Sequence, residues 1–402
     1  MDEVAGVKHV SVVASEDAVP TGKFQDKSMV SKVSSSGALS LSSTDAGTSG
    51  EAATPSRCFS SDFLVSDEDE DQEDHIVGIT KQRAADVLAD TRDGDEIGSA
   101  KPGLQLSAGV CQIPHPEKVA HGGEDSVFIA EHGAAVGVAD GVSEWGWRFG
   151  MNPRIFSDEL MAGAKAAAER DIACIQTTAK ERAASALSLG FDSVKSFGAA
   201  TALVLVLDAQ VPEAGVANLG DSSLRQFRRS SSTQRMEVVG QTKEQLHEFN
   251  RPRQLSRVPR PDDFPRLLAE GKKTLVQAVK RCKPYTPDMP SDAELYAFKA
   301  EVGDLFIIGS DGLFDNLHDA ELCDIINDDI ASAALGEEAV AAAVPAAAPG
   351  DLAKKLAEAA SRKSVCLTST TPFSQSAKAA GFEYVGGVKD DITVVAVWVV
   401  RA

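Results

Sequence analysis

The apolar residues of the chain form short runs from about residue 104 onwards, and glycine and aspartate separate most of these runs. Runs of this length, rich in Val, Leu and Ile, are typical of buried strands. Several are separated by turns short enough for hairpins, which favours antiparallel pairing over a wholly parallel sheet. We predict strands at residues 126–130, 134–139, 200–207, 216–219, 224–229, 304–309 and 391–400.

Three stretches between these strands have apolar residues at helical spacing. We predict helices at 156–171, with Ser157 as a possible N-cap, at 319–330 and at 351–361. Residues 240–300 are polar and interrupted by prolines, and they are too long for a simple connection. We interpret them as an insertion that serves binding or regulation.

Residues 1–100 differ from the rest of the chain in composition. They contain 20 acidic and 8 basic residues, many Ser and Thr, and the acidic run SDEDEDQED at 66–74. We predict a mostly disordered tail with one short helix at 79–90, followed by a single domain at 101–402. The formal net charge of the chain is −20, which disfavours a nucleic-acid partner.

The cysteines and the apolar stretches limit the cellular setting. Six cysteines lie far apart without a C-x-x-C pair, so neither a disulfide framework nor a zinc knuckle is indicated, and a reducing, intracellular compartment fits best. No stretch approaches the roughly 18 consecutive apolar residues of a membrane span, and the first residues lack the layout of a secretory signal. Early acidic residues disfavour a transit peptide without excluding it, so cytoplasm, mitochondrion and chloroplast stay open.

Acidic residues recur where the predicted strands begin or end. Three follow a strand and three precede one: Asp140, Asp221 and Asp311, and Glu124, Asp125 and Asp390. Because the end of one strand lies beside the beginning of its antiparallel neighbour, all six can gather along one edge. A single Asp-Gly pair is usually an ordinary turn, but the repetition of acidic turns indicates a site. Asp391 is an alternative to Asp390, because neighbouring strand residues point to opposite faces.

Carboxylates gathered in this way need counter-charges. Without cations their repulsion would cost on the order of several kcal/mol. An oxygen-only set with no obvious His or Cys ligand suits Mg²⁺ or Mn²⁺ better than zinc or copper. Two such ions can share a water molecule, lower its pKa and orient it for attack on phosphorus. Phosphoester hydrolysis is therefore the predicted class of reaction.

The order of these motifs resembles a known family. The series GGED, VADGV, GAATALVLVL, ANLGDSS, IIGSDGLFDNL and DDITVV, between about 105 and 400, is similar to the metal-dependent protein phosphatases of type 2C. Within that family, PHPEKVAHGGED and HEFNRPRQLS resemble the branch related to the T-cell-activation phosphatase, which has mitochondrial and chloroplast members. The resemblance implies an α+β fold: a four-layer αββα sandwich of two mainly antiparallel sheets flanked by helices, with a metal cleft at one end.

The resemblance also implies roles for the acidic residues. Asp140 would bridge two ions, the backbone carbonyl of Gly141 would bind one of them, and Asp311 and Asp390 would hold the other. Glu124 and Asp125 would act mainly through bound water. Asp221 matches a position that helps to bind a third, weaker ion. The residues expected to carry catalysis are therefore Asp140, Asp311 and Asp390.

The sequence departs from the family pattern at several positions. Val142 stands where many members have a histidine that is a proposed proton donor, although the branch resembled here also lacks it; a metal-bound water or His121 could serve as the acid. Ala120 stands where the broader family has an arginine for the substrate phosphate. The candidates to compensate are Lys118, His121 and Arg148. Ser143 and Glu144 replace a second glycine pair and add bulk near the cleft.

These observations favour one function and leave two alternatives. We expect hydrolysis of phosphoserine and phosphothreonine in phosphorylated proteins by a monomer with two, possibly three, Mg²⁺ or Mn²⁺ ions. A catalytically weak or inactive regulatory module that keeps the fold is the second hypothesis, because of the departures. A two-metal nuclease or nucleotide hydrolase is the third, although the negative charge disfavours nucleic acid.

Overall fold

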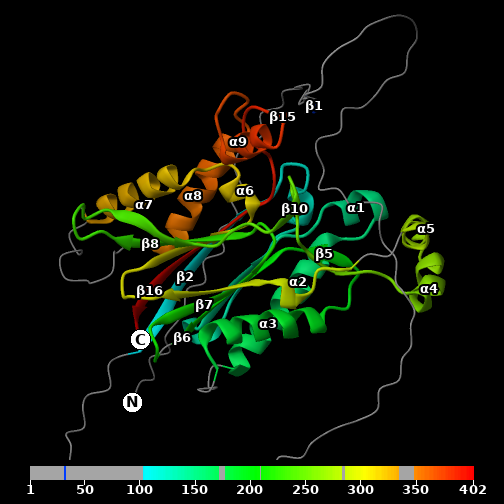
Figure 1. Ribbon diagram of the computed structural model, residues 1–402, viewed down its shortest axis with the longest axis horizontal. Coiled ribbons are helices and arrows are strands. Elements are labelled where there is room, and N and C mark those ends of the chain that lie inside the picture. Colours follow the sequence, from blue (N-terminus) through cyan, green and yellow to red (C-terminus); the bar gives the residue numbers. More distant parts are fainter. Residues whose placement is uncertain (1–30, 33–102, 172–176, 209, 283–285, 335–347) are drawn as a thin grey trace, which may run out of the picture.

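Two five-stranded antiparallel sheets face each other in the computed structural model (Figure 1). The structure describes residues 31–32, 103–171, 177–208, 210–282, 286–334 and 348–402. The first sheet has the strand order β13 (Glu294–Lys299), β7 (Glu213–Leu219), β6 (Ala202–Asp208), β4 (Ala135–Ala139) and β3 (Ser126–Ile129). The second has the order β2 (Leu104–Ile113), β16 (Ile392–Arg401), β14 (Leu305–Gly309), β8 (Ser223–Arg229) and β9 (Met236–Gln241).

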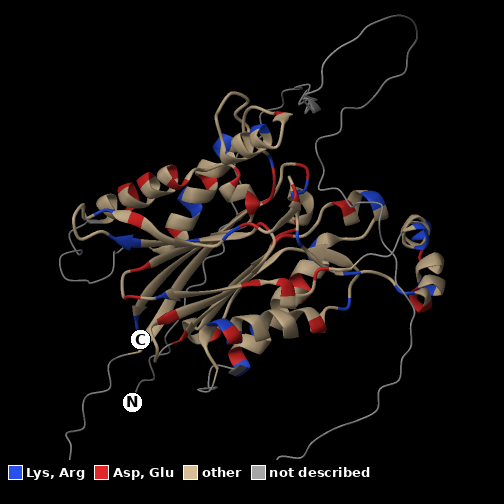
Figure 2. Ribbon diagram, viewed as in Figure 1, with Lys and Arg blue, Asp and Glu red and all other residues tan. Residues whose placement is uncertain are grey.

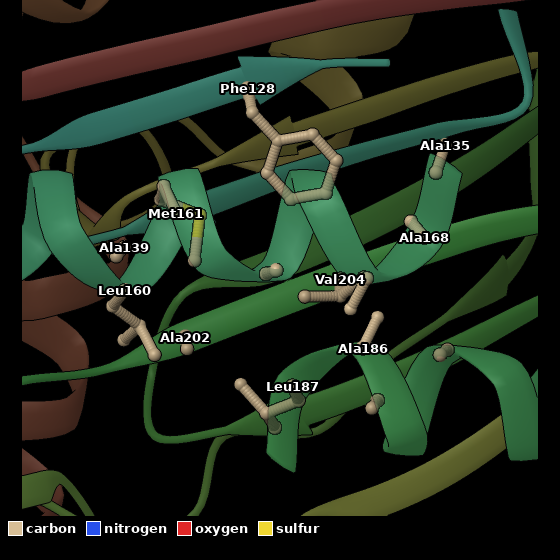
Figure 3. Packing of buried hydrophobic residues seen from close by; sticks show 14 of the residues in the cluster. Phe128, Ala135, Ala139, Leu160, Met161, Ala168, Ala186, Leu187, Ala202 and Val204 are labelled. Carbon is tan, nitrogen blue, oxygen red and sulfur yellow. The ribbon is translucent and has the colours of Figure 1, made fainter. Parts of the chain in front are cut away.

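Helices cover the outer face of each sheet. Helices α2 (Pro153–Asp171) and α3 (Ala179–Ser193) lie on the first sheet, and α7 (Asp319–Ala334) and α8 (Pro349–Ser364) lie on the second (Figure 1). Figure 3 shows Leu160 of α2, Leu187 of α3 and Val204 of β6 within one buried apolar cluster. The order helix, sheet, sheet, helix confirms the predicted four-layer α+β sandwich.

The space between the two sheets is a separate apolar core. Val138 and Leu205 of the first sheet pack in one cluster with Phe306, Ile308 and Val397 of the second, and all five are fully buried. Central strands are therefore buried on both faces, which explains why they read as continuous apolar runs rather than as alternating patterns.

The remaining elements are short and lie around the sandwich. Three small pairings join β1 (Ser31–Lys32) to β15 (Phe382–Glu383), β5 (Gly198–Ala200) to β12 (Leu255–Arg257), and β10 (Leu246–Glu248) to β11 (Arg251–Pro252). The short helices are α1 (Glu144–Phe149), α4 (Phe264–Ala269), α5 (Lys273–Arg281), α6 (Asp311–Phe314) and α9 (Pro372–Ala379). Single 3-10 turns are η1 (Val119–His121), η2 (Glu131–Gly133), η3 (Pro261–Asp263) and η4 (Pro290–Asp292).

The structure corrects two boundaries predicted from the sequence. Strand β13 is an edge strand of the first sheet, paired with β7, so the last part of segment 240–300 belongs to the sandwich and not to an insertion. Helix α2 begins at Pro153, whose fixed φ suits a first helical position, and Ser157 is a buried residue inside the helix instead of its cap. Apart from Ser31–Lys32, the predicted tail and its helix at 79–90 lie outside the described residues.

The strand register brings the acidic turns to one end of the sandwich. Ser126 pairs with Ala139, which places the residues before β3 beside those after β4. Gly309 pairs with Val394, which places the residues after β14 beside those before β16. Figure 2 shows acidic segments at this end of the sheets, near α6.

Candidate metal centre

Asp140 and Gly141 follow strand β4 and are fastened to the start of the neighbouring strand. The Asp140 carbonyl oxygen accepts a hydrogen bond from the Thr201 N–H at 3.0 Å, and the Asp140 side chain is buried. A Cβ atom at Gly141 would lie 2.8 Å from the Glu124 carbonyl oxygen. Glycine at this position therefore lets the acidic segments before β3 and after β4 come into contact.

Asp311 begins helix α6, directly after strand β14, and its side chain is buried. A Cβ atom at the next residue, Gly312, would lie 2.2 Å from the Asp391 carbonyl oxygen, so a larger residue would push the two segments apart. The N–H of Ser310 donates to the Thr393 carbonyl at 3.2 Å. The turn that carries Asp311 is thus packed against the segment that precedes β16.

Asp125 connects the segment before β3 to the turn after β14. Its Oδ2 atom accepts a hydrogen bond from the Ser310 hydroxyl at 2.7 Å, whereas its Oδ1 atom is buried and accepts none. Burial, with the neighbouring charge of Asp391, raises the pKa of the Asp125 carboxyl. A buried carboxyl oxygen without a donor is an unsatisfied acceptor to which a cation can bind.

The adjacent residues Asp390 and Asp391 have different environments. Asp391 is buried, and its carboxylate accepts hydrogen bonds from the His115 N–H at 2.7 Å and the Glu124 N–H at 2.9 Å. The Asp390 side chain is 30% exposed and accepts from the N–H of Asp391 at 2.8 Å. The carboxylate of Asp391 therefore holds the backbone of segment 115–124, which favours Asp390 as the ligand. The assignment of Asp390 stays a prediction.

The Lys118 ammonium lies among three carboxylates. Its Nζ atom is 2.6 Å from Glu124 Oε2, 3.0 Å from Asp391 Oδ2 and 3.7 Å from Asp390 Oδ1. It also donates to the Ser143 hydroxyl at 2.9 Å. Burial alone would lower the pKa of Lys118, but the carboxylates outweigh this effect and raise the pKa above its ordinary value. Lys118 is thus placed beside the predicted ligands, as a candidate for the substrate phosphate should be.

Asp221 is connected to Asp140 through hydrogen bonds of the neighbouring residues Thr201 and Ser222. The hydroxyls of Thr201 and Ser222 hydrogen-bond at 2.9 Å, and Thr201 is the residue whose N–H binds the Asp140 carbonyl. The Asp221 side chain is buried. Desolvation and the charge of Asp221 raise the pKa of Glu244.

The other two candidates for the substrate phosphate have less direct positions. His121 is exposed at the end of η1. Arg148 forms an ion pair with Glu144 of its own helix and lies over the Phe149 ring at 5.2 Å. Both assignments stay predictions.

Val142 belongs to an apolar cluster and not to the polar site. It is 1% exposed and packs with Trp145 of α1 and with Leu275 of α5. Valine at this position is therefore part of a local core to which α1 and α5 both contribute. Trp145 is buried in that core, whereas Trp147 is exposed.

Two polar side chains that the sequence prediction did not place among the site residues lie at or beside it. The Ser143 hydroxyl donates to Glu124 Oε2 and accepts from Lys118. Arg154 donates to the backbone carbonyl of Gly122, two residues before Glu124, at 2.8 Å and, from Nε, to an acidic residue one turn further along α2. The only sequence signals were the position of Ser143 directly after the Asp-Gly-Val motif and the i, i+4 spacing that pairs Arg154 with Asp158.

The carboxylate oxygens of the site suit a hard divalent cation, although they do not form a complete coordination shell. Within the described ranges, no three His, Cys, Asp or Glu side chains form a group that could hold a metal ion as they stand. The nearby side-chain donors are carboxylate oxygens, which Mg²⁺ and Mn²⁺ prefer, and the buried Oδ1 atom of Asp125 accepts no hydrogen bond. A cation bound by Glu124 or Asp390 would compete with Lys118 for the same oxygens.

Comparison with known proteins finds relatives of one family. No protein-family model matches the chain. Probable protein phosphatase 2C 80 and probable protein phosphatase 2C 55, both from Arabidopsis thaliana, are 31% and 33% identical to it over 299 and 298 residues, in each case 74% of this chain. The X-ray structure of the photosystem II phosphatase PBCP is 27% identical, with a TM-score of 0.55, and the match covers 73% of this chain and 98% of that one. The chain is therefore similar to protein phosphatase 2C proteins over 74% of its length.

The match to protein phosphatase 2C proteins concerns only part of the two Arabidopsis relatives. The chain spans 59% and 52% of their lengths. These matches confirm the family resemblance inferred from the motif order. In the described part of the chain, no helix has the length and apolar character needed to cross a membrane.

Proposed function

We propose that this protein phosphatase 2C relative hydrolyses phosphoserine and phosphothreonine in proteins, with two Mg²⁺ or Mn²⁺ ions and a third, weaker ion near Asp221. The contact between acidic turns that are distant in sequence is the observation that supports this most. Asp125 binds the residue before Asp311, and Gly312 packs on the Asp391 backbone.

Each acidic residue has a proposed part in this centre. Asp140, Asp311 and Asp390 are the proposed catalytic ligands, and the Gly141 carbonyl is the proposed backbone ligand. The remaining acidic residues, Glu124, Asp125 and Asp221, would bind through water or hold the third ion. When bound, the ions supply Lewis acidity that activates water for attack on phosphorus.

Lys118 is the proposed contact for the substrate phosphate. Its ammonium is a point charge without the planar fork of an arginine, so it can neutralise a phosphate oxygen but cannot fix the orientation of the phosphate by two parallel bonds. Ser143 would hold the lysine side chain in place through the hydrogen bond at 2.9 Å. Val142 has no proton to donate, so protonation of the leaving alkoxide falls to another group.

The full-length protein, assayed with Mn²⁺ on a phosphopeptide, a nucleotide and an oligonucleotide, tests the proposal. We expect phosphate release from the phosphopeptide, loss of that activity in chelator, and a fall of about a hundredfold or more in Asp311→Asn. Unchanged turnover in Asp311→Asn would reject the proposed chemistry. Hydrolysis confined to the nucleotide or the oligonucleotide would favour a nuclease or nucleotide hydrolase.

A regulatory module without activity is the second candidate function. The specific observation in its favour is the position of the Lys118 ammonium, which already lies within ion-pair distance of three carboxylates of the site. That candidate predicts binding of a phosphopeptide without phosphate release at any Mn²⁺ concentration. Measurable Mn²⁺-dependent release would exclude it.

A further inference from the structure

The hairpin β10–β11 within the 240–300 segment has a rigid base. Asp288 is 4% exposed, and its carboxylate binds both sides of the hairpin: the His247 Nε2 atom lies 2.8 Å from it, and the Gln254 N–H donates to it at 3.1 Å. Arg253 adds an ion pair to the same carboxylate at 3.3 Å. One buried acidic residue therefore fixes the two strands relative to each other.

The base of this hairpin is attached to the Asp221 turn. The Gln245 N–H donates to the Gly220 carbonyl at 2.8 Å, and the Gly220 N–H donates to the Gln245 side chain at 3.2 Å. Gly220 has a φ of 109°, and a Cβ atom there would lie 2.8 Å from the Arg253 carbonyl oxygen. This close, reciprocal contact makes the hairpin and the residue before Asp221 one unit.

The tip of the hairpin reaches the segment that leads to Asp390. The Phe249 ring stacks on Phe382 of β15 with centroids 5.1 Å apart, and it lies 5.4 Å from the Phe373 ring of α9. Phe373 in turn makes an edge contact with Tyr384 at 5.0 Å. Phe249 is thus the residue by which the hairpin holds α9 and β15.

The aromatic contacts continue into the proposed ligand turns. The Tyr384 hydroxyl donates to the Gly387 carbonyl at 2.7 Å. One residue further, Val388 exchanges two hydrogen bonds with the Asn316 side chain, at 3.0 and 2.9 Å. The Asn316 amide also donates to the Gly312 carbonyl at 2.9 Å, and Asn316 is fully buried. The segment before Asp390 is therefore held between the hairpin and α6.

We propose that the β10–β11 hairpin is a strap that fixes the Asp390 segment relative to the Asp221 turn, and that Phe249 is a positioning residue for the metal centre. The inference rests on the proposed function, because it assigns Phe249 a role in metal binding. Phe249 itself has no oxygen or nitrogen donor in its side chain, so it acts only through the residues that it packs against.

Calorimetric titration of Mn²⁺ into the metal-depleted full-length protein tests this role. We expect Phe249→Ala to raise the Kd for Mn²⁺ about tenfold, because two ring contacts are lost. Phe249→Tyr keeps the ring and should therefore bind Mn²⁺ with the wild-type Kd. Phe298→Ala is the matched control and should leave the Kd unchanged. Phe298 is also half-buried, and its ring stacks on that of Tyr296 with centroids 5.8 Å apart. It pairs, however, with Ala214, at the opposite end of β7 from Gly220.

A second variant and a second readout separate positioning from general stability. Phe249→Leu keeps apolar volume without a ring; weaker Mn²⁺ binding at an unchanged melting temperature of the metal-free protein supports the proposal. Wild-type Mn²⁺ affinity in Phe249→Ala and Phe249→Leu would overturn it while leaving the proposed function intact. Failure of the wild-type protein itself to bind Mn²⁺ would overturn both.

Discussion

The ammonium nitrogen of Lys118 lies 3.0 Å from Asp391 Oδ2, and this ion pair joins the segment before β3 to the segment before β16. Both side chains are largely removed from water: the Lys118 side chain is 21% exposed and that of Asp391 is 4% exposed. The lysine is therefore a structural counter-charge for the acidic turns as well as a candidate for substrate binding.

Replacement of Lys118 by methionine should destabilise the protein measured without divalent ions. We expect the free energy of unfolding to fall by about 2 kcal/mol, because largely buried carboxylates lose their counter-charge. Chemical denaturation measures the change. Lys299→Met is the control, since Lys299 is 73% exposed in its pair with Glu301 and should change stability by less than about 1 kcal/mol. Equal effects of the two substitutions would contradict this role.

Asparagine substitutions at the two adjacent aspartates should have opposite signatures. Asp391→Asn should lower the melting temperature, because the new amide nitrogen cannot accept the backbone hydrogen bonds that the carboxylate accepts from segment 115–124. Asp390→Asn should leave the melting temperature of the metal-free protein nearly unchanged and weaken Mn²⁺ binding. Thermal melts with and without Mn²⁺ measure both effects, and the reverse pattern would make Asp391 the ligand.

Gly312→Ala should impair catalysis through geometry alone. The added Cβ atom would meet the Asp391 carbonyl oxygen at 2.2 Å, so α6 must move and carry Asp311 with it. We expect phosphopeptide turnover to fall about a hundredfold, as for a misplacement of about 1 Å. Gly350→Ala, in α8, is the control because nothing lies within 4 Å of its Cβ position. Steady-state kinetics on both variants measure the effect. Wild-type turnover in Gly312→Ala would show that the packing of Gly312 against Asp391 does not position Asp311.

Cys366 should react with iodoacetamide at neutral pH. The Thr368 N–H lowers the pKa of its thiol to about 7, so the reactive thiolate accumulates as the pH rises through that value. Burial raises the pKa of Cys111 to about 11, and this thiol should stay unlabelled in the folded protein. Mass spectrometry of the two peptides across a pH series measures the rates. A labelling midpoint at Cys366 near the ordinary thiol value of about 8.5 would show the prediction to be wrong.

The central strands could be predicted from the sequence because they are buried on both faces. The run ALVLVLD of β6 is an example, since burial of nearly every residue leaves an unmistakable apolar signal. Strand β13, with the sequence ELYAFK, was missed because it is an edge strand whose residues are exposed or half-buried. Helix α3 was missed although Thr178 and Glu181 form a capping box before it.

The acidic turns of the site could also be predicted, but not the contacts between them. The positions of Asp140 and Asp311 after apolar strands are visible in the sequence, whereas the place of Lys118 among the carboxylates depends on how segment 115–124 folds back on β16. The different environments of Asp390 and Asp391 are likewise set by backbone N–H groups far away in sequence, which bind the Asp391 carboxylate. No local pattern encodes such partners.

Strands β2 and β16 pair along their whole length, so the two ends of the sandwich domain are neighbours. Leu104 pairs with Arg401, and the Ala402 N–H donates to the Gly103 carbonyl at 2.8 Å. A linker of a few residues could therefore join these ends, and the chain could be reopened at an exposed loop elsewhere. A circularly permuted sandwich domain with the same acidic turns should be attainable by this route.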